Sequence, residues 1–147
     1  MKQNKLKAFT LLELLVVIAI IGILISLGVA SFSNAQRKAR DSRRREDMKA
    51  VQNGLEQYYA DHDGAYPGGT TFTGVIETGA GTDYFPAGAP VDPKIGNTPY
   101  AIISTGDVFC VCAHLETPDG GNATSGPNAS GSCSFGSGDY FCLSNLQ

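Results

Sequence analysis

Basic residues are almost missing from the C-terminal two-thirds of this 147-residue chain. After residue 50 there are ten acidic side chains and a single basic one, Lys94, so this segment carries a net charge of about −9. A surface of this sign repels the phosphates of nucleic acids at long range. We therefore expect no nucleic-acid partner for the C-terminal region.

Histidines and catalytic motifs are also scarce. The two histidines, His62 and His114, stand in an acid-flanked helical stretch and in an extended run, and solvated polar positions explain both. The chain has no nucleophile elbow, phosphate-binding loop or established metal motif. We predict that the protein is not an enzyme and has no catalytic cofactor.

Charge is absent from Phe9 to Phe32, apart from Glu13. At 1.5 Å per residue this stretch forms a helix of ~36 Å, enough to cross a hydrocarbon core of ~30 Å. A secretory signal peptide would have a shorter apolar region, of ~7–15 residues, and the glycine-rich remainder is too small to enclose such a helix. We predict a basic leader at 1–8 and a transmembrane or filament-core helix at 9–33.

Glu13 is the anomaly in this apolar segment. A carboxylate inside a membrane costs several kcal/mol, so it needs a partner or a function. The basic leader, the Phe-Thr-Leu-Leu-Glu-Leu stretch at 9–14 and the apolar helix together resemble the class III signal of type IV prepilins and type II secretion pseudopilins.

This resemblance implies a processing site and an assembly residue. A prepilin peptidase is expected to cleave between Ala8 and Phe9 and to methylate the new amine. Glu13 is expected to pair with the Phe9 amine of a neighbouring subunit during assembly. The chain departs from the family pattern at Ala8, where glycine is usual, and at Ala30, where many pilins have proline.

Helix-forming residues continue after Phe32 through an amphipathic segment at 34–63. Gly64 suits the C-terminal cap of this helix. An apolar stripe with helical spacing, which we expect to pack on a sheet, consists of Met48, Val51, Leu55 and Tyr58.

A dense basic run occupies residues 37–45 of this helix. We expect Asp41 and Arg45, four residues apart, to form an ion pair. The run is expected to contact lipid headgroups in the membrane and the acidic head of an adjacent subunit in a filament. The positive-inside rule would keep this run in the cytoplasm, whereas the family topology exports everything after the span; we follow the family.

Residues 64–147 are predicted to form a small antiparallel β-sheet head, which gives the chain the α+β architecture of a pilin. Extended runs between Gly and Pro turns indicate strands at 72–76, 98–103, 107–116 and 139–146. The stretch at 91–102 resembles the segment before a sheet strand in the major pseudopilins of type II secretion.

All four cysteines lie in the last third of the chain, and an even count in an exported, loop-rich head indicates two disulfides. Cys110 and Cys112 point to the same face of a strand, so their partners are Cys133 and Cys142. Antiparallel pairing of the last two runs predicts Cys110 with Cys142 and Cys112 with Cys133. Zinc, with His114 nearby, is the alternative, but the spacing is not the usual C-x-x-C.

The loop at 117–138 is rich in Gly, Ser and Asn. Major pseudopilins often bind calcium in this region, and Asp119, Asn122 and Asp139 offer oxygen ligands, although no Asp-x-Asp-x-Asp-Gly loop is present. Asn122-Ala-Thr and Asn128-Ala-Ser match the glycosylation sequon.

Together these features predict a structural subunit of a type IV pilus-like extracellular filament. A type II secretion pseudopilin and a competence-type pilin for DNA uptake are the alternatives. The expected partners are other copies of the chain, prepilin peptidase, membrane-bound pilus or secretion assembly machinery, and lipid. The expected location is the cytoplasmic membrane, as a single-pass protein, and then the cell surface.

Overall fold

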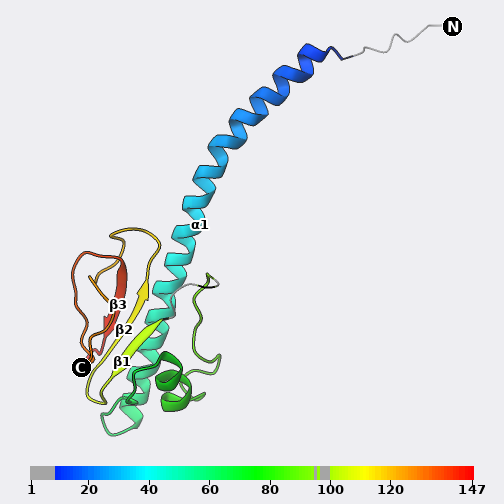
Figure 1. Cartoon of the computed structure of the whole chain (residues 1–147). Helices are drawn as coiled ribbons and strands as arrows, with labels where there is room; N and C mark the ends of the chain where they lie inside the picture. Colours follow the sequence, from blue (N-terminus) through cyan, green and yellow to red (C-terminus); the bar gives the residue numbers. More distant parts are fainter. Residues whose placement is uncertain (1–8, 95, 97–99) are drawn as a thin grey trace, which may run out of the picture. The chain divides into compact units, whose positions relative to one another are not determined.

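The computed structural model describes residues 9–94, 96 and 100–147. The chain divides into two compact units, Met1–Gln36 and Arg37–Gln147. One helix, α1 (Leu11–Asp61), contributes residues to both units (Figure 1). The long N-terminal helix and the small antiparallel sheet described below confirm the predicted α+β fold.

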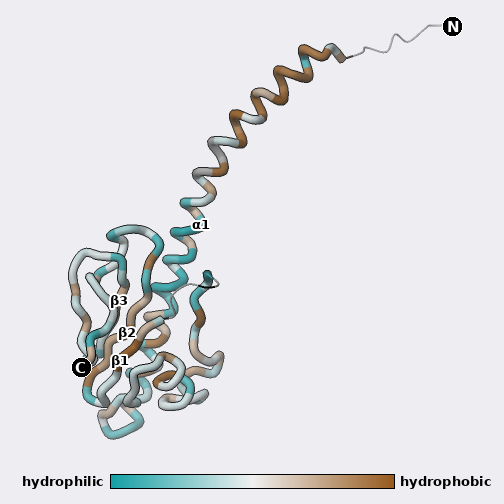
Figure 2. The backbone as a smooth tube through the Cα atoms, in the orientation of Figure 1, coloured by the Kyte–Doolittle hydropathy of each residue, from teal (hydrophilic) through white to brown (hydrophobic). Residues whose placement is uncertain are grey.

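In the first unit, α1 presents an apolar surface on all sides. The described large apolar side chains between Leu11 and Phe32 are exposed, and Figure 2 shows this part of the tube as mainly hydrophobic. Among the described residues, α1 is the one helix long and apolar enough to cross a membrane, with a mean hydropathy of 2.9 over its most apolar stretch. Such a surface needs cover from lipid or from other molecules, because exposed apolar area is costly in water.

The second unit contains a three-stranded antiparallel sheet in the order β1-β2-β3. The strands are β1 (Ala101–Ser104), β2 (Phe109–His114) and β3 (Tyr140–Ser144). Three of the four predicted strands are therefore confirmed. β2 and β3 are shorter than predicted, and β1 ends one residue beyond the predicted run at 98–103, of which residues 98 and 99 lie outside the described residues.

The main core lies between α1 and one face of the sheet. The predicted stripe on α1 is confirmed, because Met48, Val51 and Leu55 are fully buried and Tyr58 is partly buried in the same cluster. From the sheet this core receives Ile102, Phe109, Val111 and Ala113. On the opposite face of β2 a second cluster contains Cys110 and Cys112 with Ala123 and Cys142, so β2 is covered on both faces.

The predicted strand at 72–76 is wrong. This segment is helical and continues into a short wide helix, η1 (Gly74–Ala80), whose Val75 and Ile76 are buried in the main core. Phe72, Val75 and Ile76 stand at i, i+3 and i+4, which is helical rather than alternating spacing. The β-branched residues at 73, 75 and 76 favour a strand, but the helical spacing of the buried residues prevails in this five-residue segment.

Two glycines shape α1 within the second unit. Gly64 has a φ of +77° beyond the end of α1, and its N–H donates to the Tyr59 carbonyl at 3.1 Å, which supports the predicted cap. Gly54 lies under the Phe85 ring, and a Cβ at this position would stand 2.5 Å from that ring. The missing side chain at Gly54 therefore admits Phe85 to the core.

Candidate assembly site

The N-terminus of α1 is closed by a reciprocal pair of side chains. The backbone N–H and the hydroxyl of Thr10 both donate to Glu13 Oε2, each at 2.9 Å. In return the Glu13 N–H donates to Thr10 Oγ1 at 3.2 Å. This is a capping box, which satisfies amide donors that an α-helix leaves free at its first turn.

The capping box gives Glu13 a partner that the sequence interpretation overlooked. The Thr-x-x-Glu spacing immediately before an apolar run was the available signal. Both bonds from Thr10 reach one carboxylate oxygen, Oε2, and Glu13 Oε1 accepts none from the described residues. Thr10 and Glu13 both follow the expected cleavage point, so the box would persist in a processed chain.

Of the two residues that flank the expected cleavage point, the structure describes Phe9 and not Ala8. Phe9 is 83 % exposed. Ala8, with the rest of the 1–8 leader, lies outside the described residues. Cleavage and methylation there stay predictions.

In the second unit, a fully buried arginine holds three carboxylates. The Arg44 side chain has 0 % exposure and forms a two-point contact with Asp92, through Nε at 2.7 Å and Nη2 at 2.9 Å. Its Nη1 reaches Asp41 at 2.8 Å and Glu116 at 3.0 Å. Arg40 adds a second two-point contact to Glu116, at 2.6 and 2.7 Å.

The backbone completes this cluster, which we call the Arg44 cluster (Arg40, Asp41, Arg44, Asp92 and Glu116). Asp41 accepts the N–H groups of Glu116 and Thr117, at 2.9 and 3.0 Å, and the Thr117 hydroxyl at 2.7 Å. The cluster thereby ties α1 to the loop before β1 and to the segment after β2. Fork-like guanidinium contacts of this kind are specific in geometry as well as strong.

The electrostatics of the cluster favour full ionisation. Hydrogen bonding from Arg40 outweighs burial and lowers the pKa of Glu116 to about 2. Burial opposes the charged form of Asp41, but its bonds from Glu116, Thr117 and Arg44 outweigh that effect and lower the pKa of Asp41. The bonds that Arg44 donates to Asp92 raise the pKa of Arg44 despite its burial. Each carboxylate of the cluster therefore has a guanidinium group beside it.

The structure corrects the predicted role of part of the basic run. Asp41 pairs with Arg44, three residues on, and not with Arg45, whose Nη2 donates to the Gly120 carbonyl at 2.6 Å. The Arg45 side chain points to the C-terminal loop and therefore away from Asp41, which lies four residues earlier in the helix. The bases at 40, 44 and 45 thus bind their own head.

Arg43 is the member of the run that combines exposure with an internal partner. It is 68 % exposed and pairs with Asp47 at 3.1 Å. Asp47 also accepts the Tyr100 hydroxyl at 2.7 Å. Arg37 and Lys38 are exposed as well, which leaves three bases at the surface.

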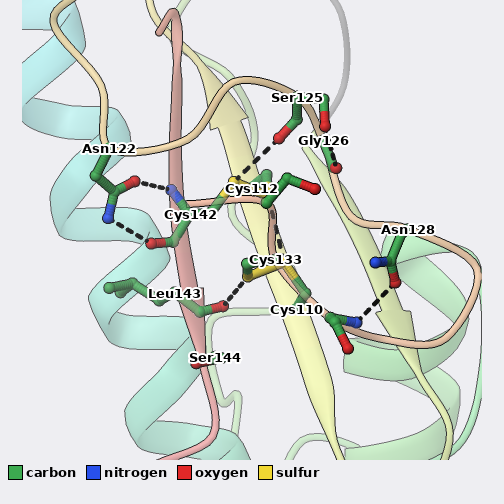
Figure 3. The surroundings of a disulfide bond; sticks show 12 residues. Cys110, Cys112, Asn122, Ser125, Gly126, Asn128, Cys133, Cys142, Leu143 and Ser144 are labelled. Carbon is green, nitrogen blue, oxygen red and sulfur yellow. Dashed lines mark hydrogen bonds between the residues drawn. A yellow bond between two sulfur atoms is a disulfide. The ribbon is translucent and has the colours of Figure 1, made fainter. Parts of the chain in front are cut away.

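The four cysteines form two disulfides, but the predicted connectivity is wrong. The bonds are Cys110–Cys133 and Cys112–Cys142. The register of β2 with β3 places Cys112 opposite Cys142 and Cys110 opposite Ser144, which leaves Cys110 for the loop cysteine (Figure 3). All four sulfurs lie within 4.8 Å of one another, and disulfide bonding withholds the thiolates that zinc would require.

The three oxygens suggested for calcium are not equally available. Asp139 Oδ1 accepts the Asp119 N–H at 2.9 Å, so these two residues are neighbours. The Asn122 amide is bonded at both ends to the Cys142 backbone, through Nδ2 at 2.9 Å and Oδ1 at 2.7 Å. Calcium binding stays a prediction, and it would have to share the Asn122 oxygen.

Comparison with known proteins agrees with the N-terminal pattern. The family described as "Prokaryotic N-terminal methylation motif" matches residues 3–29. A type II secretion system core protein G from Aeromonas hydrophila is 39 % identical over 67 residues, 46 % of each chain. The corresponding protein of Escherichia coli (strain K12) is 41 % identical over 59 residues, 40 % of this chain and 41 % of its own.

A third relative is a pilin. The type IV major pilin protein PilA of Myxococcus xanthus (strain DK1622) is 32 % identical over 57 residues, 39 % of this chain and 26 % of its own. The matches therefore span less than half the length of these relatives. No solved structure matches the chain. The chain thus contains the prokaryotic N-terminal methylation motif and is similar, over less than half of its length, to a type IV major pilin and to two type II secretion core proteins.

Proposed function

We propose that the protein is a structural subunit of a type IV pilus-like filament. The observation that carries this proposal is the methylation motif at 3–29, which continues into the apolar part of α1. The most apolar stretch of this helix is not buried against any described residue. The membrane would hold this segment before assembly, and the same segments of other copies would cover it in the filament. In this proposal the chain has a structural role in the filament and is not an enzyme.

Processing would convert the stored form into the assembling form. Cleavage between Ala8 and Phe9 by a prepilin peptidase removes the leader and creates a methylated amine at Phe9. The free Glu13 oxygen, Oε1, is then the acceptor for the Phe9 amine of a neighbouring subunit, while Oε2 keeps its bonds to Thr10. An ion pair of this kind compensates a carboxylate in apolar surroundings.

Intact-mass spectrometry of the protein from its own cells tests processing. The expected mature chain starts at Phe9, carries one methyl group, and lacks the four hydrogens lost in two disulfides. An unprocessed N-terminus in an otherwise intact chain would overturn the assignment.

A pair of variants tests the assembly role of Glu13. Glu13→Gln removes the charge and should abolish filaments seen by electron microscopy while the subunit stays in the membrane fraction. Thr10→Ala breaks the capping box but keeps the carboxylate, and it should retain assembly. Equal loss in both variants would mean that Glu13 serves the helix end and not a neighbouring subunit.

A pseudopilin is the second candidate, favoured by the two core protein G relatives at 39 % and 41 % identity. The resemblance of segment 91–102 to major pseudopilins supports it, and Asp92 in that segment holds Arg44. Deletion of the gene separates the two functions. Loss of long surface filaments supports the pilus, whereas loss of a secreted protein with surface filaments unchanged supports the pseudopilus.

A further inference from the structure

We propose that Asn128 is a site of N-linked glycosylation and that Asn122, which carries the same sequence signal, is not. The signal Asn-x-Ser/Thr occurs at Asn122-Ala-Thr and at Asn128-Ala-Ser. Sequence alone treats the two as equivalent, and the structure separates them. The proposal rests on export of the head, which is part of the proposed function.

Asn122 is structurally occupied. Its Nδ2 donates to the Cys142 carbonyl at 2.9 Å and its Oδ1 accepts the Cys142 N–H at 2.7 Å, beside a disulfide (Figure 3). A sugar on Nδ2 would have to enter the space between the loop and β3. The Thr124 hydroxyl, the third member of this sequon, points to the Ser134 carbonyl at 3.4 Å and not to Asn122.

Asn128 has the opposite arrangement, with a bonded oxygen and an open nitrogen. Its Oδ1 accepts the Ser130 N–H at 3.1 Å, the Ser130 hydroxyl at 2.7 Å and the Ser132 N–H at 3.0 Å. Two of these donors are backbone amides, so the orientation of the side-chain amide is fixed, because a flipped amide would set NH2 against N–H. Its Nδ2 has no partner among the described residues, and Asn128, Ala129 and Ser130 are exposed.

The three donors on Oδ1 also suit the chemistry of glycosyl transfer. An amide nitrogen is a poor nucleophile because its lone pair is delocalised toward oxygen. Hydrogen bonds to that oxygen stabilise the imidate form, in which the oxygen carries the negative charge and the nitrogen can attack. The Ser130 hydroxyl, which the sequon requires, supplies the shortest of these bonds.

The donor for this step is a polyprenyl-diphosphate-linked oligosaccharide, brought by a membrane glycosyltransferase. The Asn128 Nδ2 forms a bond to the anomeric carbon of the sugar, and the bond from that carbon to the diphosphate oxygen breaks. The amide proton passes to a base of the transferase, and the polyprenyl diphosphate leaves.

The backbone around Asn128 leaves room for such a group. Asn128 and Ser132 form a local turn, in which the Asn128 N–H donates to the Ser132 carbonyl and the Gly131 N–H donates to the Asn128 carbonyl. The turn is anchored by the Cys110–Cys133 disulfide. A glycan on the exposed nitrogen therefore breaks no hydrogen bond of the head.

Glycopeptide mass spectrometry of the full chain, isolated from the cells that make it, tests the proposal. We expect an oligosaccharide on the peptide that holds Asn128 and none on Asn122. Ser130→Ala and Asn128→Gln should each remove the addition, and Thr124→Ala, the matched change at the other sequon, should leave it. Retention in Asn128→Gln with loss in Ser130→Ala would show a serine-linked sugar and overturn the proposal.

The same spectra separate this proposal from the proposed function. A chain with methylated Phe9 and two disulfides but without a sugar on Asn128 would overturn the glycosylation site and leave the filament subunit intact. A sugar on Asn122 would overturn the structural argument itself.

Discussion

The substitution Arg44→Met removes the central cation of a buried cluster while keeping much of the side-chain volume. Asp41, Asp92 and Glu116 then lose four contacts of 2.7 to 3.0 Å to the guanidinium. Removing one partner of a buried ion pair costs ~3–5 kcal/mol, because the remaining charge stays desolvated without compensation. We expect the free energy of unfolding of the head to fall by this amount.

The corresponding shift in melting temperature follows from the size of the unit. Arg37–Gln147 is a unit of about 110 residues, and an unfolding entropy of ~2.1 cal/mol/K per residue gives ~0.23 kcal/mol/K. The expected fall in Tm is therefore ~13–22 °C. Near-UV circular dichroism of the tyrosines, on the full chain in a non-ionic detergent, measures it without interference from the apolar part of α1, which contains no tyrosine. Arg44→Lys is the control that keeps the charge but not the two-point contact, and it should lie in between.

The pH dependence of this effect gives a second, independent test. The pKa of Glu116, about 2, and that of Asp41 are both lowered in the folded state. Such groups contribute stability that is present above their unfolded pKa, near 4, and is lost as the pH falls through the folded pKa. Without Arg44 their pKa values rise, so the difference in Tm between variant and parent should be largest at pH 7 and smaller at pH 4. A fall of less than ~4 °C at pH 7, or a difference unchanged at pH 4, would refute the reasoning.

Three further predictions concern the rest of the head. The double variant Cys112→Ser/Cys142→Ser should keep one intramolecular disulfide, visible as a loss of two hydrogens in the intact mass; free thiols would contradict the observed connectivity. Gly54→Ala should lower the free energy of unfolding by ~1–3 kcal/mol despite its better helix propensity, because its Cβ meets the Phe85 ring; chemical denaturation measures this, and a gain in stability would contradict it. Burial and the Asp47 carboxylate raise the pKa of Tyr100, so the unfolded chain releases the phenol proton first and stability should fall as the pH rises above ~10. Tyr100→Phe should reduce that slope in an alkaline melting series, and an unchanged slope would count against it.

Local periodicity explains how much of the fold was predictable. The stripe from Met48 to Tyr58 needs only the spacing of one helix to be recognised, and the apolar run that begins at Phe9 needs only composition. Phe72, Val75 and Ile76 also have helical spacing, so the same criterion would have predicted a helix at 72–76 in place of a strand. The capping pair Thr10 and Glu13 was likewise visible in the spacing of the sequence.

The disulfide connectivity could not be obtained in the same way. Setting Cys110 or Cys112 opposite Cys142 differs by a slip of two residues between β2 and β3. A two-residue slip keeps every side chain on its own face, so the alternation of buried and exposed residues cannot detect it. The observed register depends on the long loop between the strands, whose path is a tertiary property.

The sequence also could not show which arginine of the basic run is buried, for a related reason. Seven basic residues lie between 37 and 49, and composition treats them alike. Arg44 is selected because Asp92 and Glu116, 48 and 72 residues away along the chain, approach one face of α1 in the folded head. Long-range contacts of this kind decide which charge is buried, and a sequence pattern within one helix does not contain them.

This selection also bears on the conflict between the basic run and the family topology. The positive-inside rule describes the insertion of a chain whose flanking bases are free. In the folded head Arg40 and Arg44 are held by carboxylates, and Arg45 is bonded to a loop carbonyl. Freeing Arg44 would require breaking the Arg44 cluster, which costs ~3–5 kcal/mol. In the proposed topology, folding of the head therefore removes three of the six bases of the run at 37–45 from that charge count. The other three, Arg37, Lys38 and Arg43, stay exposed.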